Sequence, residues 1–202
     1  MLKPAVRGPG LAGLILAGGE SRRMGFPKAL LSFGGSSFAD HLVDLLAAVC
    51  APVIVVVGAH AEAIRAGMRS PSPALVVENP DWRRGQLSSL QCGLRALPPD
   101  CRGVVFTPVD HPNIQPATLA ALLEAGGRAA VAIPRCQGRR GHPVYISQAV
   151  AEEVLALSAP ASAREAIRRD PDRICYVDVE DSGILDDVDD PETYSRLTGQ
   201  LP

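Results

Sequence analysis

The sequence predicts an α/β protein in which one doubly wound domain is built on a mostly parallel β-sheet. Short aliphatic runs alternate along the chain with stretches of helical periodicity, a pattern typical of consecutive β-α-β units. Hydrophobic residues make up 47% of the chain and aromatic residues only 4%, so the core must be mainly aliphatic. The chain also has 19 glycines and 18 prolines, and this surplus indicates many tight loops between strands and helices.

The first half of the chain contains the clearest elements. Residues 11–17 are an apolar run that ends at two glycines, and we predict a buried strand there. Apolar side chains recur with a helical period over residues 38–50, with Ser36 or Ser37 as the helix cap. Residues 53–57 are consecutive β-branched residues, which favours a strand covered on both faces.

The alternation continues to the end of the chain. The further predicted strands are residues 74–77, 104–109, 129–133, 144–146 and 174–179. The further predicted helices are residues 61–68, 88–97, 116–125, 148–157, 163–169 and 191–197. Ligands of doubly wound sheets bind at the carboxyl ends of the strands. The residues that directly follow each strand are therefore the candidates for a functional site.

Length and composition set the outer limits. At roughly 150 residues per domain, a chain of 202 residues predicts one domain, which we place at 11–202 after a disordered leader at 1–10. The formal net charge of −2 argues against a dedicated binder of nucleic acid or of anionic membranes. No apolar run approaches the roughly 18 residues of a membrane span. Five scattered cysteines without a C-x-x-C pair predict neither disulfides nor a zinc site and suit the cytoplasm.

A polar, glycine-rich loop follows the first strand. Gly18, Gly19 and Gly25 allow close approach of the backbone to a ligand. The same loop carries a hydroxyl and three positive charges, on Ser21, Arg22, Arg23 and Lys28. A nucleoside triphosphate, with a charge of roughly −4, needs neutralisation of this kind. The spacing matches neither the Walker A motif nor the G-x-G-x-x-G motif of dinucleotide-binding proteins, so this loop is of another type.

The stretch L-A-G-G-E-S-R-R-M-G-F-P-K resembles the signature of the molybdopterin nucleotidyltransferase family. The resemblance implies a Rossmann-like nucleotidyltransferase fold and transfer of a nucleoside monophosphate from CTP or GTP to molybdenum-bound molybdopterin. It implies that Arg23 and Lys28 act in catalysis. The nucleotide-binding residues that it implies in this loop are Leu16, Ala17, Gly18, Gly19, Ser21 and Lys28.

Two further segments resemble motifs of the same family. The run from Asn79 to Leu90 resembles the family's N-P-x-W-x-x-G-x-x-x-S-L stretch, which implies that Asn79, Gly85 and Ser88 bind the nucleotide. We expect Ser88 to cap the helix that follows. In Thr107-Pro108-Val109-Asp110-His111-Pro112, an aspartate stands at the carboxyl end of a strand. Carboxylates are ligands that Mg²⁺ prefers, and the resemblance makes Asp110 catalytic and a Mg²⁺ ligand. The family often has Gln, Met or Thr where this chain has His111, so the resemblance leaves the role of His111 open.

The last two segments concern the acceptor and the metal. Arg139-Arg140-Gly141-His142-Pro143 resembles an element of the cytidylyl branch, and we expect His142 to contact the acceptor. The segment from Leu185 to Glu192 resembles an acidic C-terminal element that completes the Mg²⁺ site. Asp187 and Asp189 share one face of an extended chain because they are two residues apart. We choose Asp189 as the second ligand, with Asp187 in reserve, and expect Asp190 to cap the last helix.

The resulting hypothesis is a Mg²⁺-dependent nucleotidyltransferase that releases pyrophosphate. CTP is favoured by the Gly85–Leu90 run and by Gly141-His142-Pro143, whereas the Ala-Gly-Gly form of the first loop is closer to the guanylyl branch. The expected acceptor is a molybdopterin-type phosphate, with another phosphorylated metabolite as an alternative. A molybdoenzyme or its chaperone is the expected protein partner. The alternative from another class is a non-catalytic carrier of molybdenum cofactor that acts as a maturation chaperone.

Overall fold

The computed structural model describes residues 10–158 and 160–201. The predicted leader, 1–10, lies outside the described residues except for Gly10, whose carbonyl accepts hydrogen bonds from the main-chain N–H groups of Arg102 and Gly103. None of the described helices is long and apolar enough to cross a bilayer.

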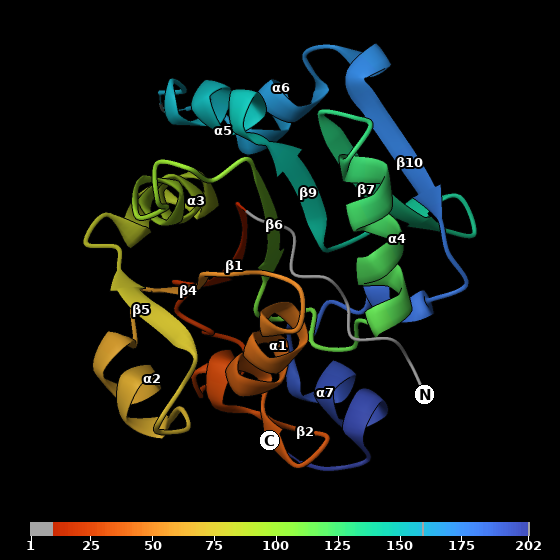
Figure 1. Ribbon diagram of the computed structural model, residues 1–202. Helices are drawn as coiled ribbons and strands as arrows, with labels where there is room; N and C mark the ends of the chain where they lie inside the picture. The colour runs from red at the N-terminus through yellow and green to blue at the C-terminus, as the bar shows by residue number, and fades with distance from the viewer. Residues whose placement is uncertain (1–9, 159, 202) are drawn as a thin grey trace.

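The fold is an α/β domain around one mostly parallel sheet (Figure 1), as the alternating pattern predicts. The strands are β1 (Leu11–Ala17), β4 (Val53–Val57), β5 (Ala74–Glu78), β6 (Gly103–Pro108), β7 (Val131–Cys136), β8 (Arg139–Arg140), β9 (Val144–Ser147) and β10 (Ile174–Asp178). Their order across the sheet is β5-β4-β1-β6-β9-β7-β10, with β8 paired to β7. Strand β9 runs antiparallel to both β6 and β7, and the short β8 is also antiparallel.

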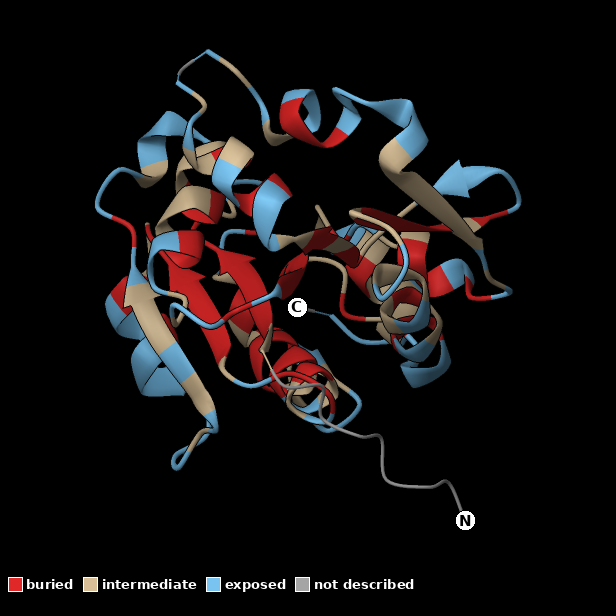
Figure 2. Cartoon of the chain, turned by 45° about the horizontal axis from the view of Figure 1, so that its top comes forward, coloured by how far each residue is buried: buried red, intermediate tan, exposed pale blue. Residues whose placement is uncertain are grey.

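Helices cover both faces of this sheet. They are α1 (Phe38–Ala47), α2 (Ala61–Gly67), α3 (Gln86–Arg95), α4 (Pro116–Gly126), α5 (Gln148–Leu155), α6 (Ala163–Arg168) and α7 (Pro191–Thr198). One core cluster joins the sheet to α1, α2, α4 and α7, and the other joins it to α3, α5 and α6. The central strands β1, β4 and β6 are buried almost throughout (Figure 2), which explains their uninterrupted aliphatic sequences.

Several local predictions are confirmed at the level of single side chains. The Ser37 hydroxyl caps α1 by accepting a hydrogen bond from the Asp40 N–H at 3.0 Å. The Asp190 carboxylate caps α7 by accepting from the Thr193 N–H at 2.8 Å, with Pro191 in the first helical turn. These caps satisfy N–H groups that have no partner within the helix.

Other local predictions are wrong. Helix α3 begins at Gln86 rather than at residue 88, and its N-cap is Gly85, whose φ of 96° suits glycine. Ser88 therefore lies inside the helix, where its hydroxyl donates to the carbonyls of Asp81 and Gly85 instead of capping. Strand β7 begins at Val131 rather than at residue 129 and continues to Cys136. The small hairpin of β2 (Ser32–Phe33) and β3 (Ser36–Ser37) is not predicted at all.

Candidate active site

The order of the strands places the site. From β1 the chain moves outward through β4 to β5 and then returns to the opposite side of β1 as β6. Strands β1 and β6 are thus neighbours whose following loops diverge, which is the place where doubly wound folds bind ligands. The loop that starts at Gly18 and the segment that starts at Val109 both begin there.

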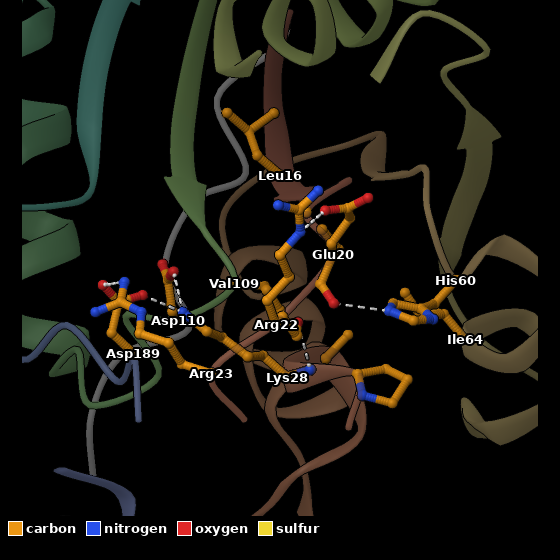
Figure 3. Close-up of a pocket in the computed structure, with 15 residues that line it drawn as sticks. Leu16, Glu20, Arg22, Arg23, Lys28, His60, Ile64, Val109, Asp110 and Asp189 are labelled. Carbon is orange, nitrogen blue, oxygen red and sulfur yellow. Dashed lines mark hydrogen bonds and ion pairs between the residues drawn. The ribbon is translucent and has the colours of Figure 1, made fainter. Parts of the chain in front are cut away.

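A cavity of about 320 Å³ opens at this edge of the sheet (Figure 3). Its walls come from the glycine-rich loop, from the end of β6, from the start of α2 and from the segment before α7. The lining residues are Leu16, Ala17, Gly19, Glu20, Ser21, Arg22, Arg23, Pro27, Lys28, Ala29, His60, Ile64, Val109, Asp110 and Asp189. Most of the residues predicted in the first loop therefore face one cavity together with two of the predicted acidic residues.

The glycine-rich loop is held in shape by Ser21. The Ser21 backbone has a φ of 52°, and its carbonyl accepts hydrogen bonds from the N–H groups of Met24 and Gly25. Its hydroxyl accepts a hydrogen bond from the Lys28 N–H at 3.2 Å. Met24 is buried, with 7% of its surface exposed, and anchors the loop in the core. A Cβ atom on Gly19 would have no neighbour within 4 Å, so open space lies beside the backbone at the cavity.

Lys28 is the centre of a charge cluster at the cavity floor. Its Nζ lies 3.0 Å from Asp110 Oδ2 and also donates to Asp189 Oδ1. Arg23 Nη2 donates to the other Asp189 oxygen, Oδ2 (Figure 3). Burial alone would lower the pKa of Lys28, but the attraction of Asp110 and Asp189 outweighs it and raises that pKa. Burial likewise opposes ionisation of Asp189, yet Lys28 and Arg23 lower its pKa. Both residues are therefore charged at neutral pH.

A second group of potential ligands lies beside this cluster. Asp110, His111 and Asp187 each offer an atom, and the three atoms lie within 4.8 Å of one another. His111 Nε2 is 4.0 Å from Asp110 Oδ1, the oxygen that does not contact Lys28. Burial and the nearby carboxylates of Asp110 and Asp189 raise the pKa of Asp187. This corner of the site therefore brings two carboxylates and an imidazole close together.

A second cavity of about 430 Å³ shares Asp110 with the first. Three arginines line it, Arg139, Arg140 and Arg164, together with both His111 and His142. The rings of His111 and His142 are 4.8 Å apart. Burial, followed by the neighbouring His111, lowers the pKa of His142 to about 3. His142 is therefore neutral at pH 7, and the positive charge of this cavity comes from the arginines.

Asn79, Gly85 and Ser88 are absent from the lining of the first cavity. Asn79 is buried, and its amide donates to the hydroxyls of Ser88 and Ser89 at 3.0 and 3.1 Å. Ser89 in turn supports the glycine-rich loop, because a Cβ atom on Gly18 would lie 2.8 Å from its hydroxyl. In this arrangement the segment supports the glycine-rich loop from the side away from the cavity lining.

Sequence reasoning missed one wall of the cavity. His60 Nε2 donates to the main-chain carbonyl of Glu20 at 2.9 Å (Figure 3), and Ile64 lies beside it on α2. Both residues follow β4, which is the neighbour of β1 in the sheet. Their position after a strand was the available signal, although a lone histidine has no motif that would single it out.

Known proteins with the same features identify the family. Residues 13–174 match the model of the MobA-like NTP transferase domain. The chain belongs to the MobA-like NTP transferase family. It is therefore a nucleotidyltransferase, and the resemblance seen in its motifs is confirmed. A probable molybdenum cofactor guanylyltransferase of Rhodopirellula baltica is 40% identical over 126 residues, which cover 60% of this chain and 58% of that protein. That similarity thus spans little more than half of either chain.

Other proteins resemble the chain over nearly its full length. The nicotine blue oxidoreductase of Paenarthrobacter nicotinovorans is 32% identical over 200 residues, 94% of this chain and 97% of that one. The crystal structure of Rv0371c from Mycobacterium tuberculosis superposes with a TM-score of 0.80 at 28% identity and covers 94% and 97% of the two chains. A crystal structure of Rv0371c in complex with manganese superposes with a TM-score of 0.77 at 26% identity and covers 94% of this chain and 98% of that one.

Proposed function

We propose that this protein transfers a nucleoside monophosphate from CTP or GTP to the phosphate of a molybdopterin-type acceptor and releases pyrophosphate. The convergence of Lys28 and Arg23 with Asp110 and Asp189 at the open side of a glycine-rich loop carries the proposal. Such a site offers backbone N–H groups and cations for a triphosphate and carboxylates for a divalent metal.

In the proposed reaction, an acceptor phosphate oxygen attacks the α-phosphorus in line. The bond from that phosphorus to the β-phosphate oxygen breaks, and pyrophosphate leaves with the electron pair. An ionised phosphate needs no general base, so positioning and charge neutralisation supply the catalysis. Lys28 and Arg23 leave their carboxylate partners to contact the phosphates. The loop around Gly18, Gly19 and Ser21 holds the triphosphate beside Leu16 and Ala17, the last two residues of β1.

The donor set of the site fits a divalent metal. The Asp187 carboxylate has no ion-pair or hydrogen-bond partner among the described residues, although it lies beside Asp110 and His111. Asp110 is the ligand in every arrangement that we consider, with Asp189 or Asp187 as its acidic partner. We propose Mg²⁺ as the family-typical ion, which when bound neutralises phosphate oxygens.

The acceptor is proposed to occupy the second cavity. Its arginines, Arg139, Arg140 and Arg164, suit a phosphorylated and otherwise polar molecule. We propose that the neutral ring of His142 contacts the acceptor there, and Asp110 joins this cavity to the nucleotide cavity. A molybdoenzyme or its chaperone is the proposed recipient of the product. We place the protein in the cytoplasm, where its five free thiols remain reduced.

A nucleotide panel tests this function. We expect pyrophosphate release with molybdenum-bound molybdopterin and a divalent metal, faster with CTP than with GTP. The motifs around Gly85 and His142 favour CTP, whereas the guanylyltransferase relative favours GTP, and the ratio of kcat/KM values separates the two. No release from either nucleotide, under conditions where both bind, contradicts the enzyme and leaves the carrier alternative.

The full-length similarity to nicotine blue oxidoreductase favours a second candidate, a reductase. An oxidoreductase must take electrons from a reductant, so NADH or NADPH oxidation with nicotine blue as the electron acceptor is the matching assay. We expect no oxidation above a heat-treated control. Steady oxidation that exceeds pyrophosphate release would instead favour the reductase.

A further inference from the structure

The three acidic residues of the site differ in how far they are already neutralised. Both carboxylate oxygens of Asp189 accept from cationic side chains, one from Lys28 and one from Arg23. Only Oδ2 of Asp110 contacts Lys28, and its Oδ1 is turned toward His111. Asp187 has no cationic partner among the described residues. The carboxylates that remain available to a metal ion are therefore those of Asp110 and Asp187.

His111 completes this group with a nitrogen ligand. Its side chain is only 12% exposed, and its Nε2 lies 4.0 Å from Asp110 Oδ1. This separation is too long for a hydrogen bond. It suits two atoms bound to one cation, since two coordination bonds of about 2.1 Å span at most about 4.2 Å. The half-buried residues Asp110 and His111 thus bring a carboxylate oxygen and an imidazole nitrogen within 4.8 Å of a carboxylate oxygen of Asp187.

The ion pairs of the cluster also leave Asp187 open to a cation. Lys28 and Arg23 pair with Asp189, and Lys28 also pairs with Asp110. The exposed carboxylate of Asp187 takes part in none of these pairs and lies beside Asp110 and His111. A divalent ion can therefore reach it without displacing a side-chain cation.

Behind this cluster, the ring of His142 packs against the ring of His111. Nδ1 of His111 and Nδ1 of His142 both lack a hydrogen-bond partner among the described residues, and the two rings are in contact. A ligand bond at Nε2 of His111 keeps its proton on Nδ1. The contact with the ring of His142 then helps to hold the His111 imidazole in place.

We propose that Asp110, His111 and Asp187 form a mixed nitrogen–oxygen site for a divalent cation, and that His111 makes this site prefer a first-row transition ion to Mg²⁺. Carboxylates alone suit Mg²⁺, whereas an imidazole ligand favours transition metals. The proposal deepens the proposed function and rests on it, because the ion would serve the same reaction. It also replaces Asp189 by Asp187 as the acidic partner of Asp110.

Manganese is the probe for the test, because its electron spin resonance reports both affinity and ligand type. The intact protein is titrated with Mn²⁺ alone, and Mg²⁺ is then added as a competitor. We expect Mn²⁺ to bind at least tenfold more tightly than Mg²⁺. Pulsed resonance of the bound ion should show ¹⁴N modulation from a directly coordinated imidazole.

Three variants assign the ligands. His111→Gln should lose the ¹⁴N modulation and at least tenfold in Mn²⁺ affinity, while its Mg²⁺ affinity changes less than threefold. Asp187→Asn should weaken the binding of both ions. His60→Gln is the matched control, because His60 lines the nucleotide cavity but lies outside the cluster, and it should keep the modulation. Absence of Mn²⁺ binding, bound Mn²⁺ without ¹⁴N modulation, or modulation that survives His111→Gln overturns the proposal.

These results are independent of the nucleotidyltransferase assay. Pyrophosphate release without ¹⁴N modulation removes His111 from the metal site and leaves the proposed function intact. Modulation without pyrophosphate release supports the metal site and contradicts the proposed function.

Discussion

Lys28 Nζ lies 3.0 Å from Asp110 Oδ2, although the two residues are 82 positions apart and follow different strands. The contact joins the loop after β1 to the end of β6, at the point where the order of the strands across the sheet reverses. In the proposed reaction, the lysine and the carboxylate therefore neutralise each other until the triphosphate and the metal ion bind. Nucleotide and metal should consequently bind together more readily than either binds alone.

Replacing the lysine should separate metal binding from catalysis. Lys28→Met removes the cation that competes for Asp110 and Asp189, so the affinity for a divalent metal alone should rise. Turnover should fall by about 10²–10³, the usual cost of losing one preorganised charge at a reacting phosphate. Calorimetric metal titration and steady-state pyrophosphate release measure the two effects. Arg65→Met, which breaks an exposed pair with Glu78, is the control and should change neither. Weaker metal binding in Lys28→Met would contradict the account.

Asp110→Asn should abolish turnover without unfolding the protein. The amide keeps the shape of the side chain, and Lys28 retains Asp189 as a partner. Metal affinity should fall at least tenfold while the melting temperature stays within a few degrees. Asp44→Asn, at an exposed pair with Arg69, is the control. Activity retained in Asp110→Asn would remove this residue from the metal site.

Gly19, which lines the cavity, and Gly58, which directly follows β4, should respond differently to alanine. A Cβ atom on Gly58 would lie 2.6 Å from the Gly18 carbonyl oxygen and 2.6 Å from Trp82 Cβ, so Gly58→Ala should cost about 1–3 kcal/mol of the free energy of unfolding. Gly19→Ala meets no atom within 4 Å and should change stability by less than about 0.5 kcal/mol. It should nonetheless weaken nucleotide binding, because the methyl group enters the cavity. Urea unfolding and nucleotide-induced thermal shifts measure both; unchanged nucleotide affinity in Gly19→Ala would place the triphosphate elsewhere.

Stability should decrease in mild acid because of His142. Its folded-state pKa of about 3 lies below the ordinary value of 6.5, so between these values the unfolded chain binds the proton and the folded chain does not. The stabilisation is complete above pH 6.5 and is lost as the pH falls from 6.5 toward 3, by up to about 1.4 kcal/mol per pH unit. Urea unfolding at pH 7 and pH 5.5 should show this loss in the wild type and a smaller one in His142→Gln. Equal losses in both proteins would be contrary to a buried neutral ring.

Local sequence patterns predicted the fold well where one principle dominated. The aliphatic runs of β1 and β4 can only be buried strands, and the Ser37 and Asp190 caps follow from side chains that bind nearby N–H groups. The hairpin of β2 and β3 was missed because each strand has only two residues, joined by Gly34 and Gly35. The start of α3 was missed because the positive φ of Gly85 is a property of the folded backbone.

The candidate site also has features that the sequence predicted and features that it did not. The gathering of the loop residues and Asp110 at one edge of the sheet was predictable from polar residues that follow strands. The partition of charge between Asp187 and Asp189 was not, because it depends on which aspartate Lys28 and Arg23 reach across the fold. The packing of His111 against His142 likewise joins residues from different loops, which a single sequence does not pair.

The most direct test of the central claim follows the α-phosphate. The protein is incubated with α-³²P-labelled CTP or GTP, a divalent metal and molybdenum-bound molybdopterin, and the products are separated. We predict that the label moves into a dinucleotide form of the acceptor in a one-to-one ratio with unlabelled pyrophosphate. Label that stays in the nucleoside triphosphate with both nucleotides, while the acceptor remains unmodified, would contradict nucleotidyl transfer at the site around Lys28 and Asp110.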